Sequence, residues 1–425
     1  MSFLSKFFSK NSRVPKLFLI SFIGVVSFFF ITFSVSCNSK EKFSSEGSKQ
    51  KITLALRSGL YSDVIKSCLR DFEKANNVVC EVQDFSEDDL HKAVLESNGN
   101  IDFCMADSSW QAEFTAKGIL ANLSEYGYEL DEDIIKATKT ICYYKDNVYL
   151  APYYGNVTVL LYNKLMFEEA GYKPTDIISV EDMLKICRTA KKRHNLGFMY
   201  RGDTENNVVV DFLPILLSFG GWVVDENNYP TVAGPKFEKA VNTYLELIKT
   251  GRQAKKEDLV AAIANKAACM GIGWPGWYTP TKNSSMDYIA FSGKRAKKAI
   301  PYNSNIYGIW TIGVPESSKN KEIAVKLLEH LMDKDVQKAT VEKGGVPCRY
   351  SSLGDSEIQA KFPQYKVVLE ALEGGVYRPV MQEWSEFYTI LGKHLKEIFN
   401  GETEVKKGIR SAQLELEELL SKKID

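Results

Sequence analysis

Ile52-Thr-Leu-Ala-Leu56 and Ile101-Asp-Phe-Cys-Met105 are short, almost uninterrupted apolar segments, which is the pattern of buried β-strands. Between them lie a helical pattern of apolar residues, a β-rich segment at Val78-Val-Cys-Glu-Val82, and a second helical pattern over 87–97. Strands that alternate with helices in units of about 25 residues indicate a mostly parallel sheet with helices on both faces. This region therefore predicts an α/β domain.

A second α/β region follows and continues into a helical end. Apolar residues at steps of four and three between Val405 and Leu419 indicate a long C-terminal helix. The chain of 425 residues is long enough for two domains of the usual roughly 100–200 residues each. The other expected strands are 158–162, 267–272 and 309–314, and the other expected helices are 179–193, 210–219, 236–249 and 320–333.

The N-terminus has the order of an export signal. Four basic residues precede an apolar run from Leu17 to Phe33, and Ser34-Val-Ser-Cys37 follows. This pattern resembles bacterial lipoprotein signals, although Ser34 stands where most of them carry Leu. We expect residues 1–36 to be a signal peptide, Cys37 to be lipidated, and residues 37–51 to form a flexible, Ser- and Lys-rich tether. A retained membrane helix is the alternative, because the run approaches the roughly 18–20 apolar residues that a span requires.

Both readings of the N-terminus place the domain outside the cytoplasm and hold it at a membrane. Whether the protein faces a periplasm or the cell exterior stays open. The whole chain has 54 basic and 54 acidic residues, and the four charged residues of the signal are all basic. The mature part is therefore slightly acidic, which argues against nucleic acid as a partner.

Cysteine and histidine patterns predict neither a disulfide framework nor a metal site. Of eight cysteines, seven remain if Cys37 is lipidated, an odd number without a CxxC motif, although single bridges such as Cys68 to Cys80 stay open. The four histidines are scattered and no HExxH motif occurs. We expect no cofactor and no metal.

Two motifs could indicate nucleotide binding or hydrolysis, but neither is interpreted in that way. Gly271-Ile-Gly-Trp-Pro-Gly276 fits the GxGxxG pattern, but Trp274 is bulky and Pro275 has no N–H to offer a pyrophosphate. It is better interpreted as an aromatic loop at the carboxyl end of a strand, where ligands bind in open α/β sheets. Asp102 and Asp107 could be the carboxylates of an exported glycan hydrolase, but no nucleophile with a base and an orienting group is evident. The chain is predicted not to be an enzyme.

Nearly the whole mature chain, some 370 residues, resembles the family 1 extracellular solute-binding proteins, the ligand-capturing subunits of ABC importers, especially those for sugars. The likeness depends on the order and spacing of several segments, because none is decisive alone. These segments are Asn147–Pro152, Leu160–Lys164, Phe167–Gly171, Phe219–Gly221, Met270–Trp274, Gly308–Pro315, Ser318–Lys321 and Gly344–Arg349.

The resemblance implies an α/β, two-lobed fold of the type II periplasmic-binding-protein kind, with the ligand in a cleft between the lobes. Lobe 1 would comprise 52–154 and 308–348, and lobe 2 would comprise 155–307 and 349–425. The implied crossings are near Tyr154–Val157, Ile306–Trp310 and Arg349–Ser351.

By position, the resemblance implies a set of ligand-binding residues around this cleft. For Asp211 the alternative to ligand binding is an acidic residue on the surface of a helix. Trp222 and Trp310 are expected in the core. The full set is Arg57, Tyr61, Asp107, Trp110, Tyr153, Tyr154, Asn156, Asp211, Trp274, Trp277, Tyr278, Arg349, Tyr377 and Trp384.

The expected function is that of a membrane-anchored, monomeric binding protein that captures a saccharide by lobe closure and delivers it to an ABC permease. Tyr and Trp faces suit the apolar patches of a sugar ring, and polar groups suit its hydroxyls. The identity and length of the saccharide stay open. A non-transporting receptor or adhesin with the same fold is the second hypothesis, and a glycan hydrolase is the third.

Overall fold

The computed structural model describes residues 49–422, apart from 178, 195, 279–284 and 292–303. Ser48–Asp425 forms one compact unit. The expected signal peptide, Cys37 and most of the tether lie outside the described residues. Within the described part, no helix is both long and apolar enough to cross a membrane.

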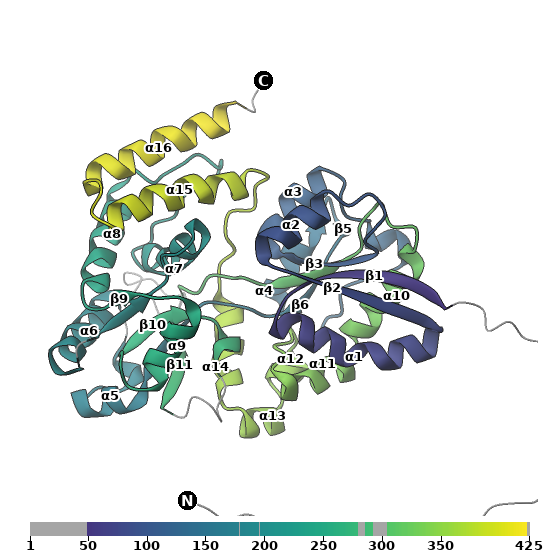
Figure 1. Ribbon diagram of the computed structural model, residues 1–425, viewed down its shortest axis with the longest axis horizontal. Helices are drawn as coiled ribbons and strands as arrows, with labels where there is room; N and C mark the ends of the chain where they lie inside the picture. Colours follow the sequence, from purple (N-terminus) through teal and green to yellow (C-terminus); the bar gives the residue numbers. More distant parts are fainter. Residues whose placement is uncertain (1–48, 178, 195, 279–284, 292–303, 423–425) are drawn as a thin grey trace, which may run out of the picture. The chain divides into compact units, whose positions relative to one another are not determined.

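The first sheet has the strand order β2-β1-β3-β12-β6 (Figure 1). These strands are β1 (Gln50–Arg57), β2 (Val78–Phe85), β3 (Phe103–Asp107), β6 (Ala151–Tyr154) and β12 (Trp310–Gly313). Strands β1, β2 and β3 run parallel, whereas β12 is antiparallel to both β3 and β6. Helices α1 (Leu60–Asn76) and α10 (Lys321–Met332) pack together on one face, and α2 (Glu87–Leu95) covers the other (Figure 1). We call this part lobe 1.

The second sheet has the order β11-β7-β10-β8-β9. It comprises β7 (Val159–Asn163), β8 (Phe198–Tyr200), β9 (Arg252–Gln253), β10 (Met270–Gly273) and β11 (Met286–Ala290). Alternate residues of β7 enter different hydrophobic clusters, because successive side chains of a strand point to opposite faces. One face packs against α6 (Val180–His194), α7 (Glu205–Ser218) and α8 (Pro235–Ile248), and the other packs against α9 (Lys256–Ala264) and α14 (Gln364–Gly374). We call this part lobe 2.

The α/β fold class and the predicted elements are confirmed, with one correction. Strands β1, β2 and β3 pair in parallel as the sequence predicts for that region, but β12 joins them antiparallel, and the second sheet is mixed as well. Strand β12 enters the first sheet from lobe 2 and therefore runs against its neighbours. Hydrophobic periodicity reports that a segment is a strand but carries no information about its direction.

Three chain segments cross between the lobes and bond to one another. Thr158 N donates to Ile306 O at 2.9 Å, and Tyr307 N donates to Val376 O at 2.9 Å. A segment at Val376 therefore bonds to the second crossing, and the crossing that the resemblance implies near Arg349–Ser351 stays a prediction. The helices between these two positions contribute Leu353, Val368 and Leu372 to a buried cluster that contains residues of both sheets, including β3 and β7. The exact lobe limits stay a prediction.

The remaining described elements complete the two lobes. Helices α15 (Trp384–Phe399) and α16 (Val405–Ser421) pack on α7 and α8, so the predicted C-terminal helix belongs to lobe 2 (Figure 1). Cys68, Cys80, Cys104, Cys142, Cys187, Cys269 and Cys348 are free thiols. The other strands and helices are β4 (Tyr143–Tyr144), β5 (Asn147–Val148), α3 (Gln111–Ala116), α4 (Lys136–Lys139), α5 (Lys164–Ala170), α11 (Lys334–Thr340), α12 (Tyr350–Leu353) and α13 (Ser356–Lys361), with short 3₁₀ turns at 108–110, 123–126, 140–142, 174–176, 275–277 and 341–343.

Candidate ligand-binding site

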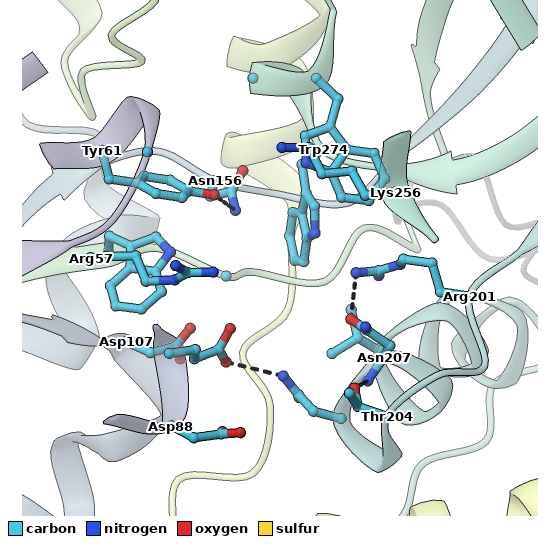
Figure 2. Close-up of a pocket in the computed structure, with 18 of the residues that line it drawn as sticks. Arg57, Tyr61, Asp88, Asp107, Asn156, Arg201, Thr204, Asn207, Lys256 and Trp274 are labelled. Atoms are coloured by element: carbon cyan, nitrogen blue, oxygen red, sulfur yellow. Dashed lines mark hydrogen bonds between the residues drawn. The ribbon is translucent and has the colours of Figure 1, made fainter. Parts of the chain in front are cut away.

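A cavity of about 580 Å³ lies where the ends of strands and the beginnings of helices from both lobes converge (Figure 2). Lobe 1 contributes the end of β1, the beginnings of α1 and α2, and the end of β3. Lobe 2 contributes the beginnings of α7 and α9 and the loop after β10. This position is expected, because ligands in open α/β sheets bind beyond the carboxyl ends of the strands. Its size is in the usual range of small-molecule sites, about 300–1,000 Å³.

The turn from β1 into α1 brings Arg57 and Tyr61 to the cavity. Gly59 has a φ of 84°, a value that residues with a side chain adopt only with strain, so glycine suits this turn. Arg57 Nη1 donates to Ser58 Oγ at 2.9 Å, and its guanidinium lies 5.9 Å from the centre of the Trp310 ring. The Tyr61 hydroxyl accepts from Asn156 Nδ2 at 3.2 Å, and burial raises the pKa of Tyr61 above its usual value. Tyr61 is therefore neutral at physiological pH.

Asp107 and Arg378 form a buried ion pair on the lobe 1 side. Asp107 ends β3 and accepts from the Ser109 backbone N at 2.8 Å and from Ser109 Oγ at 2.7 Å. The same oxygen, Oδ1, accepts from Arg378 Nη2, and the two residues are 3% and 5% exposed. Burial works against the charge of Arg378, but Asp107 together with Glu87 and Tyr388 outweighs it and raises the pKa of the guanidinium. Both side chains are held in place by charge-assisted hydrogen bonds.

Arg201 organises the lobe 2 wall. Its Nε lies 3.2 Å from both carboxylate oxygens of Asp211, and its Nη1 donates to Asn207 Oδ1 at 2.6 Å. Burial raises the pKa of Asp211, although Arg201 opposes this shift. The guanidinium also lies 5.1 Å from the centre of the Trp277 ring, and Lys256 Nζ lies 5.8 Å from it, which are cation–π distances. Asp211 therefore acts on the cavity wall through Arg201.

Trp274 and Trp310 bring aromatic surface to the cavity from its two sides. Trp274 lies against Gly308 in the second crossing, where an added Cβ would come within 2.6 Å of the indole. Trp310 packs edge-on to Trp110, with ring centres 5.6 Å apart, and is only 3% exposed. The sequence predicts Trp310 in the core, and the residue is buried, but it also lines the cavity.

Seven of the fourteen predicted ligand-binding residues line the cavity: Arg57, Tyr61, Asp107, Tyr154, Asn156, Trp274 and Trp277. The loop after β10 and the strand ends are thus brought together as the sequence implies. The seven others, Trp110, Tyr153, Asp211, Tyr278, Arg349, Tyr377 and Trp384, are not among the lining residues. Ligand contact stays a prediction for all fourteen.

The residues outside the lining have other partners in the structure. Trp110 packs behind Trp310, Tyr278 lies edge-on to Tyr288, and the Tyr377 hydroxyl donates to Thr138 O at 3.1 Å. Tyr153 and Trp384 are buried, and Asp211 lies behind the wall with Arg201.

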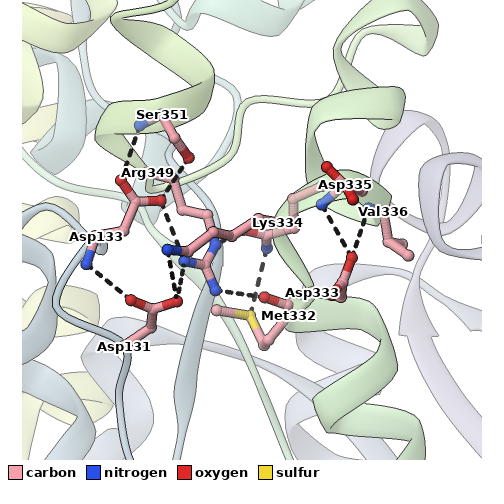
Figure 3. A network of polar contacts seen from close by, with 10 residues as sticks. Asp131, Asp133, Met332, Asp333, Lys334, Asp335, Val336, Arg349 and Ser351 are labelled. Carbon is pink, nitrogen blue, oxygen red and sulfur yellow. Dashed lines mark hydrogen bonds and ion pairs between the residues drawn. The ribbon is translucent and has the colours of Figure 1, made fainter.

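Arg349 belongs to a separate polar network (Figure 3). Its Nη1 contacts Asp131 Oδ2 at 2.9 Å and Asp133 Oδ2 at 3.2 Å, and its Nε donates to Gln337 at 2.8 Å. The side chain is 3% exposed. This network joins residues that are 218 positions apart in the sequence, so its observed role is structural.

Several lining residues were not predicted from the sequence, namely Glu87, Arg201, Asn206, Asn207, Lys256, Arg378 and Tyr388. Most of them stand at or near the beginning of a helix. One signal was available, because Ser86 and Thr204 are N-cap residues whose side chains accept backbone N–H groups and mark these beginnings. Arg378 gave no such signal, because it lies in an irregular crossing segment.

Three buried side-chain atoms of lining residues have no hydrogen-bond partner within the described structure. They are the donors Arg57 Nε and Arg378 Nε and the acceptor Asn156 Oδ1. Buried polar groups in native proteins are nearly always hydrogen-bonded, and an unpaired one costs about 1–3 kcal/mol. Two donors and one acceptor of residues beside the cavity are therefore left without a protein partner. In the described ranges, no group of three or more His, Cys, Asp or Glu residues could hold a metal ion.

A family model described as bacterial extracellular solute-binding protein matches residues 57–338. This chain belongs to that family. Members of the family bind a substrate as a non-catalytic component of a transporter, so the protein is not an enzyme.

Individual relatives of this solute-binding protein share its length but little of its sequence. A Sinorhizobium fredii protein named as a probable amino-acid ABC transporter periplasmic-binding protein is 24% identical over 358 residues, 79% of this chain and 81% of the relative. A solute-binding protein of Thermotoga lettingae bound to α-D-tagatose has a TM-score of 0.75 at 24% identity and covers 87% of this chain and 100% of its own. One of Agrobacterium radiobacter in complex with ribitol has a TM-score of 0.77 at 20% identity, with 87% and 98% covered. At these identities the two structures support the fold.

Proposed function

We propose that this solute-binding protein captures an uncharged sugar or sugar alcohol and delivers it to the permease of an ABC importer. The observation that carries the proposal is the set of unpartnered polar atoms beside aromatic faces. A hydroxyl group both donates and accepts, so one polyol can satisfy Asn156 Oδ1 and the Nε groups of Arg57 and Arg378. Trp274 and Trp310 supply apolar surface for its C–H groups.

The charges around the cavity support a neutral ligand. Asp107 is paired with Arg378, Asp211 with Arg201, and Glu205 with Lys396 at 2.8 Å. The two buried carboxylates Asp107 and Asp211 are thus each paired with an arginine of the protein. A free amino acid carries two full charges and would have to compete with these pairs, whereas a polyol would not.

We further propose that Cys37 is lipidated and that residues 37–51 tether the domain, as a monomer, to the outer face of a membrane. The N-terminal order of basic residues, apolar run and Cys37 supports this proposal. Anchoring would keep the captured ligand close to the permease, which raises its effective concentration. Mass spectrometry of the mature N-terminus would test it, since an unmodified Cys37 or a retained Met1 contradicts lipidation.

Isothermal titration calorimetry tests the ligand class. We expect saturable binding to at least one hexose, disaccharide or sugar alcohol and no binding to free amino acids. The opposite result, saturable binding to an amino acid and none to a polyol panel, would overturn the proposal.

Asn156 offers a matched pair of variants for the same experiment. Asn156→Asp keeps an acceptor atom, whereas Asn156→Ala removes it. We expect Asn156→Ala to weaken binding by about tenfold or more, because a ligand hydroxyl loses its partner. Asn156→Asp should weaken binding less. Tyr143→Ala, an exposed residue outside the cavity lining, serves as the control and should bind as the parent does.

A further inference from the structure

The two lobes are joined across the cavity by a hydrogen bond between side chains that the sequence did not single out. Glu87 is the first residue of α2 in lobe 1, and Asn206 is the second residue of α7 in lobe 2. Asn206 Nδ2 donates to Glu87 Oε1 at 3.0 Å, although the residues are 119 positions apart. Both residues are among those that line the cavity. This bond exists only while the beginnings of the two helices are within reach of each other.

The surroundings of Glu87 contain charges of both signs. Burial and Asp107 raise the pKa of Glu87, while Arg378 and Arg57 oppose the shift and the adjacent Asp88 adds to it. Tyr388 of α15, in lobe 2, also lies near Glu87. Burial is the main cause that raises the pKa of Tyr388, and the charge of Glu87 raises it further. From α7 of lobe 2, Asn206 forms the hydrogen bond to Glu87. An acceptor at this place thus gains a partner when the lobes approach.

We propose that Glu87 and Asn206 are positioning residues that set ligand affinity by bonding to each other across the cavity. This proposal rests on the proposed function, in which the lobes close over a ligand. In a protein that exchanges between open and closed arrangements, any bond present in one of them alone shifts the populations toward it. The apparent affinity falls in proportion to the loss of the binding-competent population. A single hydrogen bond to a charged group accounts for about a tenfold change.

The chemistry of the pair defines four informative variants. Glu87→Ala and Asn206→Ala each remove the bond, whereas Glu87→Gln keeps an oxygen that accepts from Asn206. Asn206→Asp places a second carboxylate against Glu87 and should drive the lobes apart. Lys92→Ala, an exposed residue of the same helix α2, is the matched control. Urea unfolding of every variant checks that the fold is intact.

Small-angle X-ray scattering of the ligand-free mature protein is the deciding experiment. We expect Glu87→Ala and Asn206→Ala to increase the radius of gyration by the same amount, and the double variant to add nothing further. Asn206→Asp should increase it most, while Glu87→Gln and Lys92→Ala should match the parent. Unchanged scattering in the alanine variants, or an additive effect in the double variant, overturns the proposal.

Titration of any ligand then separates positioning from direct contact. Because the pair acts on the populations, each alanine variant should weaken all ligands by the same factor, about tenfold or less. A factor that differs from ligand to ligand would show that the residues contact the ligand and would overturn the proposal. If no sugar or polyol binds at all, the proposed function fails, and the scattering result still decides the role of the pair.

Discussion

Asp211 illustrates at the scale of one residue how a side chain can shape a binding site without touching a ligand. The residue is 0% exposed and accepts from Arg201, which is itself 6% exposed. Arg201 then orients Asn207 and faces Trp277, which line the cavity. A buried pair of this kind adds little net stability, but removing one partner strands the other charge.

We predict that Arg201→Leu destabilises the protein by about 3–5 kcal/mol at pH 7, because Asp211 is left buried without its partner. Burial raises the pKa of Asp211, and Arg201 no longer opposes it in the variant. A group whose pKa is raised in the folded state loses its contribution to stability as the pH rises through that value. The variant should therefore lose more stability at pH 8 than at pH 5. Urea unfolding at several pH values measures this.

Arg188→Leu is the matched control for that experiment. The Arg188–Glu246 pair spans 2.8 Å, but the two side chains are 54% and 42% exposed. Exposed pairs contribute about 0–1 kcal/mol. An equal loss in both variants would contradict the role given to burial.

The place of the cavity follows from the sequence more directly than the identity of the side chains that line it. Arg57 and Asp107 end β1 and β3, so their positions follow from the strand pattern. Asp211 lies on a helix that is buried nearly all around, so the hydrophobic pattern does not say which way it points. Arg378 lies in irregular chain, where no periodicity exists. Side-chain direction in such places depends on tertiary packing that one sequence does not display.

At the scale of elements, the aromatic loop after β10 depends on the crossing that it packs against. Trp274 lies on Gly308, and Gly308 N donates to Asn156 O of the first crossing at 2.9 Å. The backbone of the two crossings therefore supports the loop, and the Trp274 indole has little freedom to move. The absence of a side chain at Gly308 is a requirement of this contact.

We predict that Gly308→Ala weakens ligand binding and destabilises the protein by about 1–3 kcal/mol, because overpacking forces Trp274 out of its position. In Gly308→Ala/Trp274→Ala the clash disappears. Gly308→Ala should therefore destabilise the Trp274→Ala variant less than it destabilises the parent protein. Urea unfolding of the four proteins gives this coupling, and calorimetry gives the binding. Equal effects in both backgrounds would show that the contact with Trp274 is not the cause.

The bounds of elements were predictable where the pattern is long and regular, as in α8 and α10. The position of the third crossing stays a prediction, because the helix α14 before Val376 contacts elements on both sides. Val368 and Leu372 belong to a buried cluster with residues of both sheets, and α14 contacts β11 of lobe 2 as well as α4 and α12. A helix with apolar residues for two partners gives no sign in the sequence of where the chain changes lobe.

At the scale of the whole molecule, Arg349 ties its own segment to a segment that lies 218 positions earlier in the chain. The residue pairs with Asp131 and Asp133, and Ile134 forms a β-bridge with Arg349 itself (Figure 3). The hydrogen bond from Asp133 N and the Arg349 guanidinium outweigh burial and lower the pKa of Asp131. Burial would raise the pKa of Asp133, but Ser351 and Arg349 together hold it below the usual value.

These shifts predict how the stability of the molecule depends on pH. A carboxyl group whose folded pKa is depressed stabilises the protein above its unfolded pKa, about 4, and this contribution disappears as the pH falls through the folded value. We predict that unfolding becomes easier below about pH 4 and that Arg349→Met removes part of this dependence, in addition to costing about 3 kcal/mol at pH 7. Urea unfolding between pH 2 and 7, followed by tryptophan fluorescence, measures both effects. Lys361→Met, which breaks the exposed Lys361–Glu342 pair, is the control and should change neither. A pH profile of Arg349→Met that runs parallel to that of the parent would show that the pair with Asp131 and Asp133 is not what links protons to the stability of this fold.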